Sequence, residues 1–244
     1  MTIWFATGNT HKKQELSGIL LDAVPAVAPS AAFELKIPSE AGLDFEPDEK
    51  GTSFLENALI KAGELWLILK QKGILKSGEP VIADDSGICV DALGGRPGIH
   101  SARYGTEGKY AYRSKFPAPL RLGLRLFGDK LSSPLDDAGR NALLLSELGS
   151  NPARNARFVC AMVLYYSPDR FFAAQETLEG ELVPNAEASR GKGGFGYDPI
   201  LYIPALGKTV AELSEGEKNR LSHRGKAGRA IAKILFGGAD DPAR

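Results

Sequence analysis

The sequence predicts an α/β protein, in which short buried strands are followed by amphipathic helices. At the start of the chain, the apolar run TIWFAT (2–7) ends at Gly8 and Asn9 and is followed by Leu and Ile at helical spacing. Further along, RFVCAMVLYY (157–166) and FFAAQETLEGELV (171–183) are two long strand-like runs joined by a turn. Strands and helices are mixed along the chain without a detectable repeat, which is typical of α/β folds.

Capping signals and periodicity place the other elements. Ser53 and Glu56 form a capping-box signature, which predicts a helix that continues to Leu69. Ser214 and Glu217 form a second such signature. The remaining expectations are strands at 33–37, 80–83 and 88–93, a helix from about residue 10, a helix at 138–148, and helical sequence from 214 toward 236.

Composition restricts the class of protein. Lys plus Arg and Asp plus Glu number 30 each, so the chain lacks the basic excess of a general nucleic-acid-binding protein. It shows neither a secretion leader nor an apolar run of about 18 residues, so neither secretion nor membrane spanning is expected. Cys89 and Cys160 lie in apolar runs without a ligand or disulfide spacing, which indicates buried thiols in a reducing compartment. A cytoplasmic protein is therefore expected.

The segment ATGNTHKK predicts a phosphate site. A strand that runs through Gly into a helix start exposes backbone N–H groups at the positive end of the helix dipole. Lysine in the first turn opposes that dipole unless an anion is bound. An ordinary turn with solvated lysines is the alternative, since the segment matches neither common phosphate-loop pattern. The candidate residues are Thr7, Gly8, Asn9, Thr10, His11 and Lys12.

The segment IADDSG places two carboxylates side by side after an apolar run. Consecutive strand residues point to opposite faces, so Asp84 and Asp85 can share a site only if the strand ends there, as Ser86 and Gly87 suggest. One carboxylate is then expected to face the site and the other to support it from behind. Magnesium, which binds through one or two carboxylates and substrate phosphates, would offset their charge. The alternative is a turn in which the Asp side chains cap backbone N–H groups.

Three further segments carry candidate site residues. The acidic loop EPDEKG supplies Glu49 as a second metal ligand, although carboxylates also favour helix starts for structural reasons. The glycine-rich GKGGFGYDP can bring an aromatic face and Asp198 to a nucleobase, or can be a tight loop whose aromatic residues pack into the core. In EKNRLSHRGKA, a helix break near Ser222 would bring Lys218, His223 and Arg224 together; otherwise they form a solvated helix face.

Together and in this order, these segments resemble the inosine/xanthosine triphosphate pyrophosphatase family. The resemblance spans nearly the whole chain and rests on TGNTHK, GTSFLENALIKA, ADDSGICVDALGGRPGIHSARY, GGFGYDPI and AELSEGEKNRLSHRGKA. It implies an α/β fold of two lobes around a long central mixed sheet, with the nucleotide in the cleft. It also implies a magnesium-dependent homodimer that hydrolyses ITP, dITP and XTP to the monophosphate plus pyrophosphate. Residues 1–244 would form one such domain, with 106–134 as an insertion and 237–244 as a flexible tail.

The resemblance also assigns roles to residues. Asp85 would be the catalytic carboxylate and a metal ligand, with Glu49 as the second ligand and Lys50 standing where the family often has Thr. Thr7 to Lys12 would hold the triphosphate, and Ser86 would touch the substrate. The other substrate-binding residues would be Arg103, Phe195, Gly196, Tyr197, Asp198, Lys218, His223 and Arg224.

The chemistry of a triphosphate suggests how these residues would act. Lys12 and Mg²⁺ would absorb charge on the leaving pyrophosphate, while Asp85 orients or deprotonates the attacking water. A donor from the His223–Arg224 region would favour a 6-oxo purine over adenine. Three other functions remain open. They are a pyrophosphatase for modified pyrimidine or methylated nucleotides, a nucleotide sensor without turnover, and a phosphatase with an aspartate nucleophile that releases inorganic phosphate.

Overall fold

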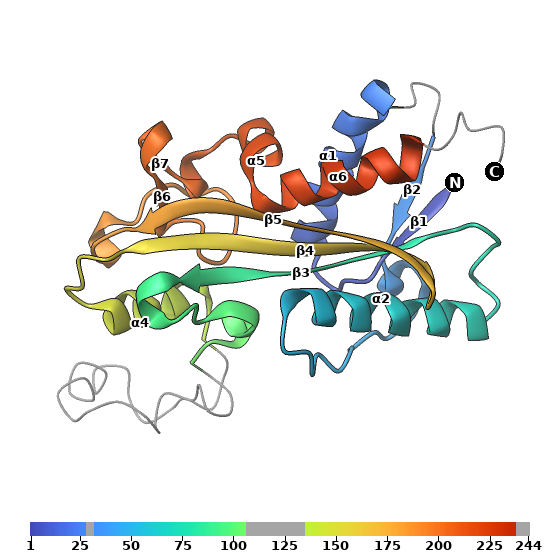
Figure 1. Cartoon of the computed structure of the whole chain (residues 1–244), viewed down its shortest axis with the longest axis horizontal. Helices are drawn as coiled ribbons and strands as arrows, with labels where there is room; N and C mark the ends of the chain where they lie inside the picture. The colour runs from blue at the N-terminus through green and yellow to red at the C-terminus, as the bar shows by residue number, and fades with distance from the viewer. Residues whose placement is uncertain (28–31, 106–134, 238–244) are drawn as a thin grey trace. The chain divides into compact units, whose positions relative to one another are not determined.

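The structure, a computed structural model, describes residues 1–27, 32–105 and 135–237. Seven strands form one mixed sheet in the order β2-β1-β3-β4-β5-β6-β7, with helices packed against it (Figure 1). This confirms the predicted α/β class. The expected insertion at 106–134 and residues 238–244 of the expected tail lie outside the described residues.

Most elements coincide with the predicted segments, whereas the short strands at 201–203 and 208–209 were not predicted. The strands are β1 (Thr2–Phe5), β2 (Glu34–Lys36), β3 (Val81–Val90), β4 (Asn155–Ser167), β5 (Arg170–Leu182), β6 (Leu201–Ile203) and β7 (Lys208–Thr209). The helices are α1 (Thr10–Val27), α2 (Phe54–Gln71), α4 (Asp137–Leu148), α5 (Glu215–Leu221) and α6 (His223–Gly237), with short 3₁₀ turns that include η3 (Gly98–Arg103). Strand β1 pairs in parallel with both β2 and β3, whereas β6 pairs antiparallel with β5 and β7.

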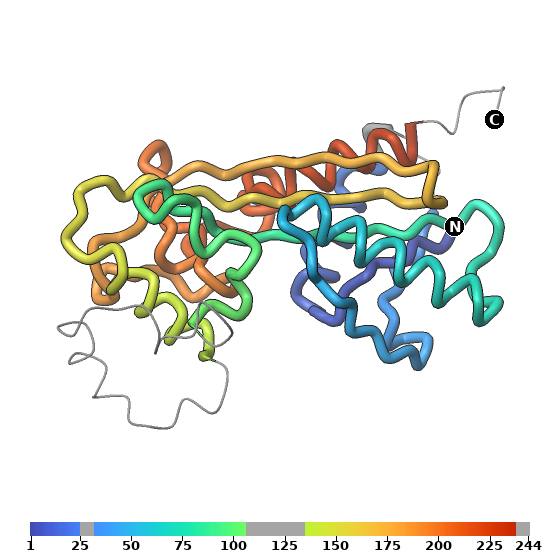
Figure 2. Tube along the Cα trace, turned by 60° about the horizontal axis from the view of Figure 1, so that its bottom comes forward, coloured from blue at the N-terminus to red at the C-terminus, as the bar shows by residue number. Residues whose placement is uncertain are grey.

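The chain divides into two compact units. Unit 1 comprises Met1–Ser86, Phe158–Leu178 and Glu215–Arg244, and unit 2 comprises Gly87–Arg157 and Glu179–Ser214. Strands β3, β4 and β5 contribute residues to both units, and Figure 2 shows β4 and β5 side by side along their length.

No helix in the part of the chain that the structure describes is long and apolar enough to cross a membrane.

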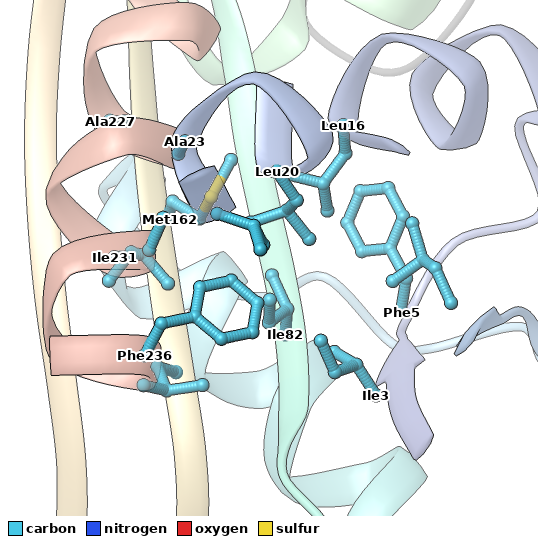
Figure 3. Packing of buried hydrophobic residues seen from close by; sticks show 14 of the residues in the cluster. Ile3, Phe5, Leu16, Leu20, Ala23, Ile82, Met162, Ala227, Ile231 and Phe236 are labelled. Carbon is cyan, nitrogen blue, oxygen red and sulfur yellow. The ribbon is translucent and has the colours of Figure 1, made fainter. Parts of the chain in front are cut away.

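Unit 1 has a hydrophobic core on each face of its sheet. Ile3 and Phe5 of β1 pack with α1 and α6 (Figure 3), whereas Trp4 of β1 and the residue after the strand, Ala6, pack with α2 on the opposite face. Strand β3 continues this alternation, with Ile82 in the first core and its neighbours in the second. Because side chains alternate along a strand, adjacent residues of β3 face different helices.

One expectation about β3 was wrong. The strand does not end at Ser86–Gly87 but runs without interruption from Val81 to Val90, so the strands expected at 80–83 and 88–93 are one element. Gly87 fits there because a Cβ atom would lie 2.4 Å from the Gly98 carbonyl oxygen and from Ser101 Oγ. The glycine therefore permits close packing of η3 against β3 within unit 2.

Helix ends in unit 1 agree with the capping signals, with one change. Ser53 Oγ accepts a hydrogen bond from the Glu56 N–H at 3.2 Å. The Glu56 carboxylate accepts from the Thr52 N–H at 2.6 Å, whereas a standard capping box would use the Ser53 N–H. The helical sequence after Ser214 is broken at Ser222, as predicted, because Ser222 Oγ accepts from the Gly225 N–H at 3.0 Å and begins α6.

Candidate active site

Asp84 is the centre of a buried ionic cluster on the α1–α6 face of β3. Lys12 of α1 donates to both its carboxylate oxygens at 3.0 Å, and the Arg224 guanidinium of α6 donates to Oδ2 at 3.1 and 3.3 Å. Arg224 also donates to Ser86 Oγ at 2.8 Å. Only 1% of the Asp84 side chain is exposed. The structure therefore brings together Lys12, Ser86 and Arg224, three of the predicted substrate-binding residues.

Asp85 faces the opposite side of the strand, toward α2. Lys61 donates to its Oδ1 at 2.9 Å and Asn57 donates to its Oδ2 at 3.2 Å. Lys61 also lies 3.4 Å from Glu49 Oε1, so the two carboxylates that sequence assigned to a metal share one ammonium group. Lys50 pairs with Asp48 instead.

The two aspartates have opposite pKa shifts. Burial opposes ionisation of Asp84, but the nearby Lys12, Arg224 and Lys61 outweigh it and hold the Asp84 pKa well below its usual range. For Asp85, burial outweighs the stabilising effect of Lys61 and raises the pKa. Asp84 is therefore a fixed anion, whereas the ionised form of Asp85 would gain from an additional cation.

The residues around Asp85 fit a magnesium ion. With both acids ionised, Asp85 and Glu49 exceed the single charge of Lys61, and their carboxylates are hard oxygen donors. No group of three or more His, Cys, Asp or Glu side chains that could hold a metal occurs among the described residues. Magnesium commonly binds through one or two carboxylates together with substrate phosphates.

A second carboxylate, Glu15 of α1, organises the basic side chains. Its oxygens contact Lys218 Nζ and Arg224 Nη1, each at 2.5 Å. Burial opposes ionisation of Glu15, but Arg224 and Lys218 outweigh it and lower its pKa. The break at Ser222 thus brings Lys218 of α5 and Arg224 of α6 to one acid. Three cations, Lys12, Lys218 and Arg224, surround two carboxylates and leave one net positive charge.

The start of α1 is exposed and shaped by its own side chains. Asn9 Oδ1 accepts from the N–H groups of His11 at 2.9 Å and Lys12 at 3.2 Å, and Thr7 Oγ1 accepts from the Asn9 N–H at 3.1 Å. Gly8 to His11 are exposed, and a Cβ atom on Gly8 would meet no other atom within 4 Å. The predicted phosphate segment is therefore open to a ligand, and Lys12 lies between it and Asp84.

His223 is buried beside the ionic cluster around Asp84. Its ring stacks on Phe158 at a centroid distance of 4.8 Å, and its Nδ1 has no hydrogen-bond partner among the described residues. Burial, together with the charges of Arg224 and Lys218, places the His223 pKa well below its ordinary value. A neutral imidazole with an unpaired buried nitrogen is suited to hydrogen-bond a polar ligand.

The glycine-rich segment belongs to unit 2. Tyr197 is buried and its hydroxyl donates to the Ser101 carbonyl at 2.9 Å, so its side chain packs in the core, which was one of the two sequence alternatives. Asp198 Oδ2 accepts from the Phe195 N–H at 2.9 Å. Phe195 and Gly196 are half-buried and line a pocket of about 420 Å³ with residues of α4. Arg103, also in unit 2, is half-buried at the end of η3.

Sequence comparison identifies the family. A sequence model described as the Ham1 family matches residues 3–116 and 126–234. The chain belongs to the Ham1 family. The dITP/XTP pyrophosphatase of Treponema denticola is 41% identical over 237 residues, which are 97% of this chain and 100% of that protein. A dITP/XTP pyrophosphatase of Thermus thermophilus is 38% identical over 240 residues, 98% of this chain and 93% of that protein. These findings confirm the family resemblance.

Solved structures agree with the fold of this Ham1 protein. The Ham1 protein of Staphylococcus aureus has a TM-score of 0.68 and 29% identity, covering 97% of this chain and 99% of its own. The nucleoside-triphosphatase, or dITP/XTP pyrophosphatase, of Mycobacterium abscessus has a TM-score of 0.61 and 32% identity, covering 96% and 100%.

Sequence reasoning missed three residues of the candidate site, Lys61, Asn57 and Glu15. Asn57 and Lys61 lie on the face of α2 that also carries Ala58, Ala62 and Leu65, and all five are buried. A lysine at a core position of an amphipathic helix is rarely fully buried unless it is paired. That pattern was visible in the sequence and would have indicated a buried carboxylate partner.

Proposed function

We propose that this Ham1 protein hydrolyses non-standard purine nucleoside triphosphates, dITP, ITP and XTP, to the nucleoside monophosphate and pyrophosphate. The observation that carries the proposal is the separation of charge across β3. On one face, Lys12, Lys218 and Arg224 leave a net positive charge suited to a polyphosphate. On the other face, Asp85 and Glu49 leave a net negative charge suited to a divalent cation. The relatives named dITP/XTP pyrophosphatase support the choice of substrates.

The side chains of this chain would divide the reaction between them. Lys12 and the N-terminus of α1 bind the triphosphate, and Arg224 and Lys218 neutralise its charge. Strand β1 pairs with β3 only as far as Ile82, so we place the triphosphate at the edge of β3 beyond that residue, where Asp85 would hold the attacking water in line with the α-phosphorus and take its proton. Mg²⁺, held by Asp85 and Glu49, supplies charge neutralisation on the phosphate oxygens when bound.

Base recognition would use one imidazole nitrogen and one aromatic ring. The unpaired Nδ1 of neutral His223 binds the edge of a 6-oxo purine, and an adenine edge that mismatches it would leave a buried polar group unsatisfied. Phe195 provides a ring face for the base, a role in which stacking contributes about 1–3 kcal/mol per base.

We further propose a cytoplasmic homodimer. Free Cys89 and Cys160 are both buried, which suits a reducing compartment, and the dimer is what the family resemblance implies. Size-exclusion chromatography with light scattering should give twice the mass of one chain, which is 26.1 kDa. A mass of 26.1 kDa at micromolar concentration would contradict the dimer.

Product analysis tests the proposed activity. The purified protein would be incubated with Mg²⁺ and separately with ITP, XTP, dITP, GTP and ATP. The proposal expects pyrophosphate and monophosphate from the first three and little turnover of the last two. Inorganic phosphate as the first product would indicate a phosphatase, turnover of modified pyrimidine nucleotides a different specificity, and binding without turnover a sensor.

A further inference from the structure

The backbone of Gly196 is held by two side chains of α4. Its N–H donates to Asp137 Oδ2 at 2.6 Å, and its carbonyl oxygen accepts from Asn141 Nδ2 at 3.1 Å. Asp137 and Asn141 are four residues apart and therefore lie on the same face of the helix. One helix face thus contacts both polar groups of a single residue, within unit 2.

Gly196 depends on these two hydrogen bonds more than an ordinary loop residue would. Gly196 has a φ of 65°, a conformation that side-chain-bearing residues rarely adopt. Its neighbour Tyr197 is buried and anchored to Ser101, while its other neighbour, Phe195, remains half-buried. The orientation of the Gly196 backbone therefore helps to set the direction in which the Phe195 side chain projects from the loop.

The Asn141 side chain makes one hydrogen bond and leaves one polar atom without a partner among the described residues. Its Nδ2 is engaged by Gly196, but its Oδ1 is buried without a hydrogen-bond partner among the described residues. An unpaired buried oxygen is unfavourable and is uncommon in folded proteins. Leucines on the same helix, Leu144 and Leu148, fill the core nearby in sequence, so an apolar residue at position 141 would avoid the unpaired atom.

We propose that Asp137 and Asn141 are positioning residues for nucleobase recognition. By fixing the Gly196 backbone they fix the direction of the Phe195 ring, which the proposed function assigns to the base. The inference rests on that proposed function. It assigns the two residues an effect on binding of the base and none on binding of the polyphosphate.

The test compares ITP with a ligand that lacks a base. For Asn141→Asp, which places an acceptor against the Gly196 carbonyl, KM for ITP should rise about tenfold, the scale of one lost hydrogen bond. The kcat should change less than threefold. The inhibition constant of inorganic tripolyphosphate should stay within a factor of two of the wild type. Asp137→Ala should show the same division, and Asp137→Asn, which keeps an acceptor for the Gly196 N–H, should recover most of the loss.

Two controls keep the test interpretable. Ser146→Ala changes an exposed residue of the same helix and should alter none of these constants. Thermal melting identifies variants that fold poorly, and if Asn141→Asp is one of them, Asn141→Ala removes the donor without adding charge. Equal increases in the KM for ITP and in the inhibition constant of tripolyphosphate would overturn the inference. An unchanged KM for ITP in a folded variant would also overturn it. Absence of pyrophosphate release by the wild-type protein would instead refute the proposed function.

Discussion

Asp84 and Asp85 are adjacent in the chain, and their carboxylates point to opposite faces of β3. Asp84 contacts Lys12 of α1 and Arg224 of α6, whereas Asp85 contacts Lys61 and Asn57 of α2. Asp84 is buried with two cations and Asp85 with one, Lys61, so the two like charges are tolerated side by side. The two acids consequently differ in pKa and, we infer, in role.

Replacing Asp85 should remove turnover with little loss of stability. Asp85→Asn retains the shape of the side chain and the contact with α2 but removes the proposed proton acceptor. We expect kcat for ITP to fall about 10²-fold or more, the scale of losing a general base. Steady-state pyrophosphate release at saturating Mg²⁺ measures this directly. Turnover near that of the wild type would remove Asp85 from the mechanism.

Lys61 should compete with magnesium in the absence of substrate. In Lys61→Met, Asp85 and Glu49 lose their shared cation, so the protein should be destabilised by about 3–5 kcal/mol without metal. Added Mg²⁺ should then raise the melting temperature more in this variant than in the wild type, because ligand binding to the folded state adds stability. EDTA should reverse the increase. Equal responses of both proteins to Mg²⁺ would argue against a metal at these carboxylates.

Glu15 should contribute stability that disappears in acid. Its pKa is lowered in the folded state, so the contribution is complete above the unfolded value of about 4.3 and is lost as pH falls through the folded value. Glu15→Gln should lower the free energy of unfolding at pH 7 by about 2 kcal/mol. It should also flatten the dependence of stability on pH below about 4.3. Urea unfolding between pH 3 and pH 7 tests both effects, and parallel curves for the two proteins would contradict them.

His223 should make stability depend on pH in a different range from Glu15. Because its pKa is depressed in the folded state, the unfolded chain takes up a proton below about pH 6.5 while the folded protein does not. Stability should therefore decrease as pH falls below about 6.5, by up to about 1.4 kcal/mol per pH unit. His223→Gln should remove this slope between pH 5 and 6.5. NMR titration offers an independent check, since a His223 imidazole that titrates near pH 6.5 would refute the assignment.

Much of the fold could be predicted from local sequence signals. The capping residue Ser53, the helix break at Ser222 and the turn after Ser167 are all set by short-range chemistry, and each occurs where expected. The course of β3 was not predictable in this way. Gly87 signals a strand end locally, but in the structure it admits η3 close to the strand, a tertiary effect that sequence does not show.

The sequence predicted which residues lie in the candidate site better than it predicted which residues they contact. Lys12, Ser86, Lys218 and Arg224 were assigned to one site, and the structure brings them together around Asp84 and Glu15. The sequence also left open whether the aromatic residues of the glycine-rich loop face a ligand or the core. Burial decided this for Tyr197, because its hydroxyl reaches a carbonyl 96 residues away in the chain.

The most direct test of the division between the two aspartates is the free energy of unfolding of Asp84→Asn and Asp85→Asn, measured side by side at pH 7 without metal. Asp84→Asn removes the anion that Lys12 and Arg224 share, so we expect a loss of about 3–5 kcal/mol. Asp85 has a raised pKa, so burial already disfavours its ionised form and its neutral replacement should cost less stability than Asp84→Asn. Equal losses in both variants, or a larger loss for Asp85→Asn, would contradict the assignment of Asp84 to structure and Asp85 to chemistry.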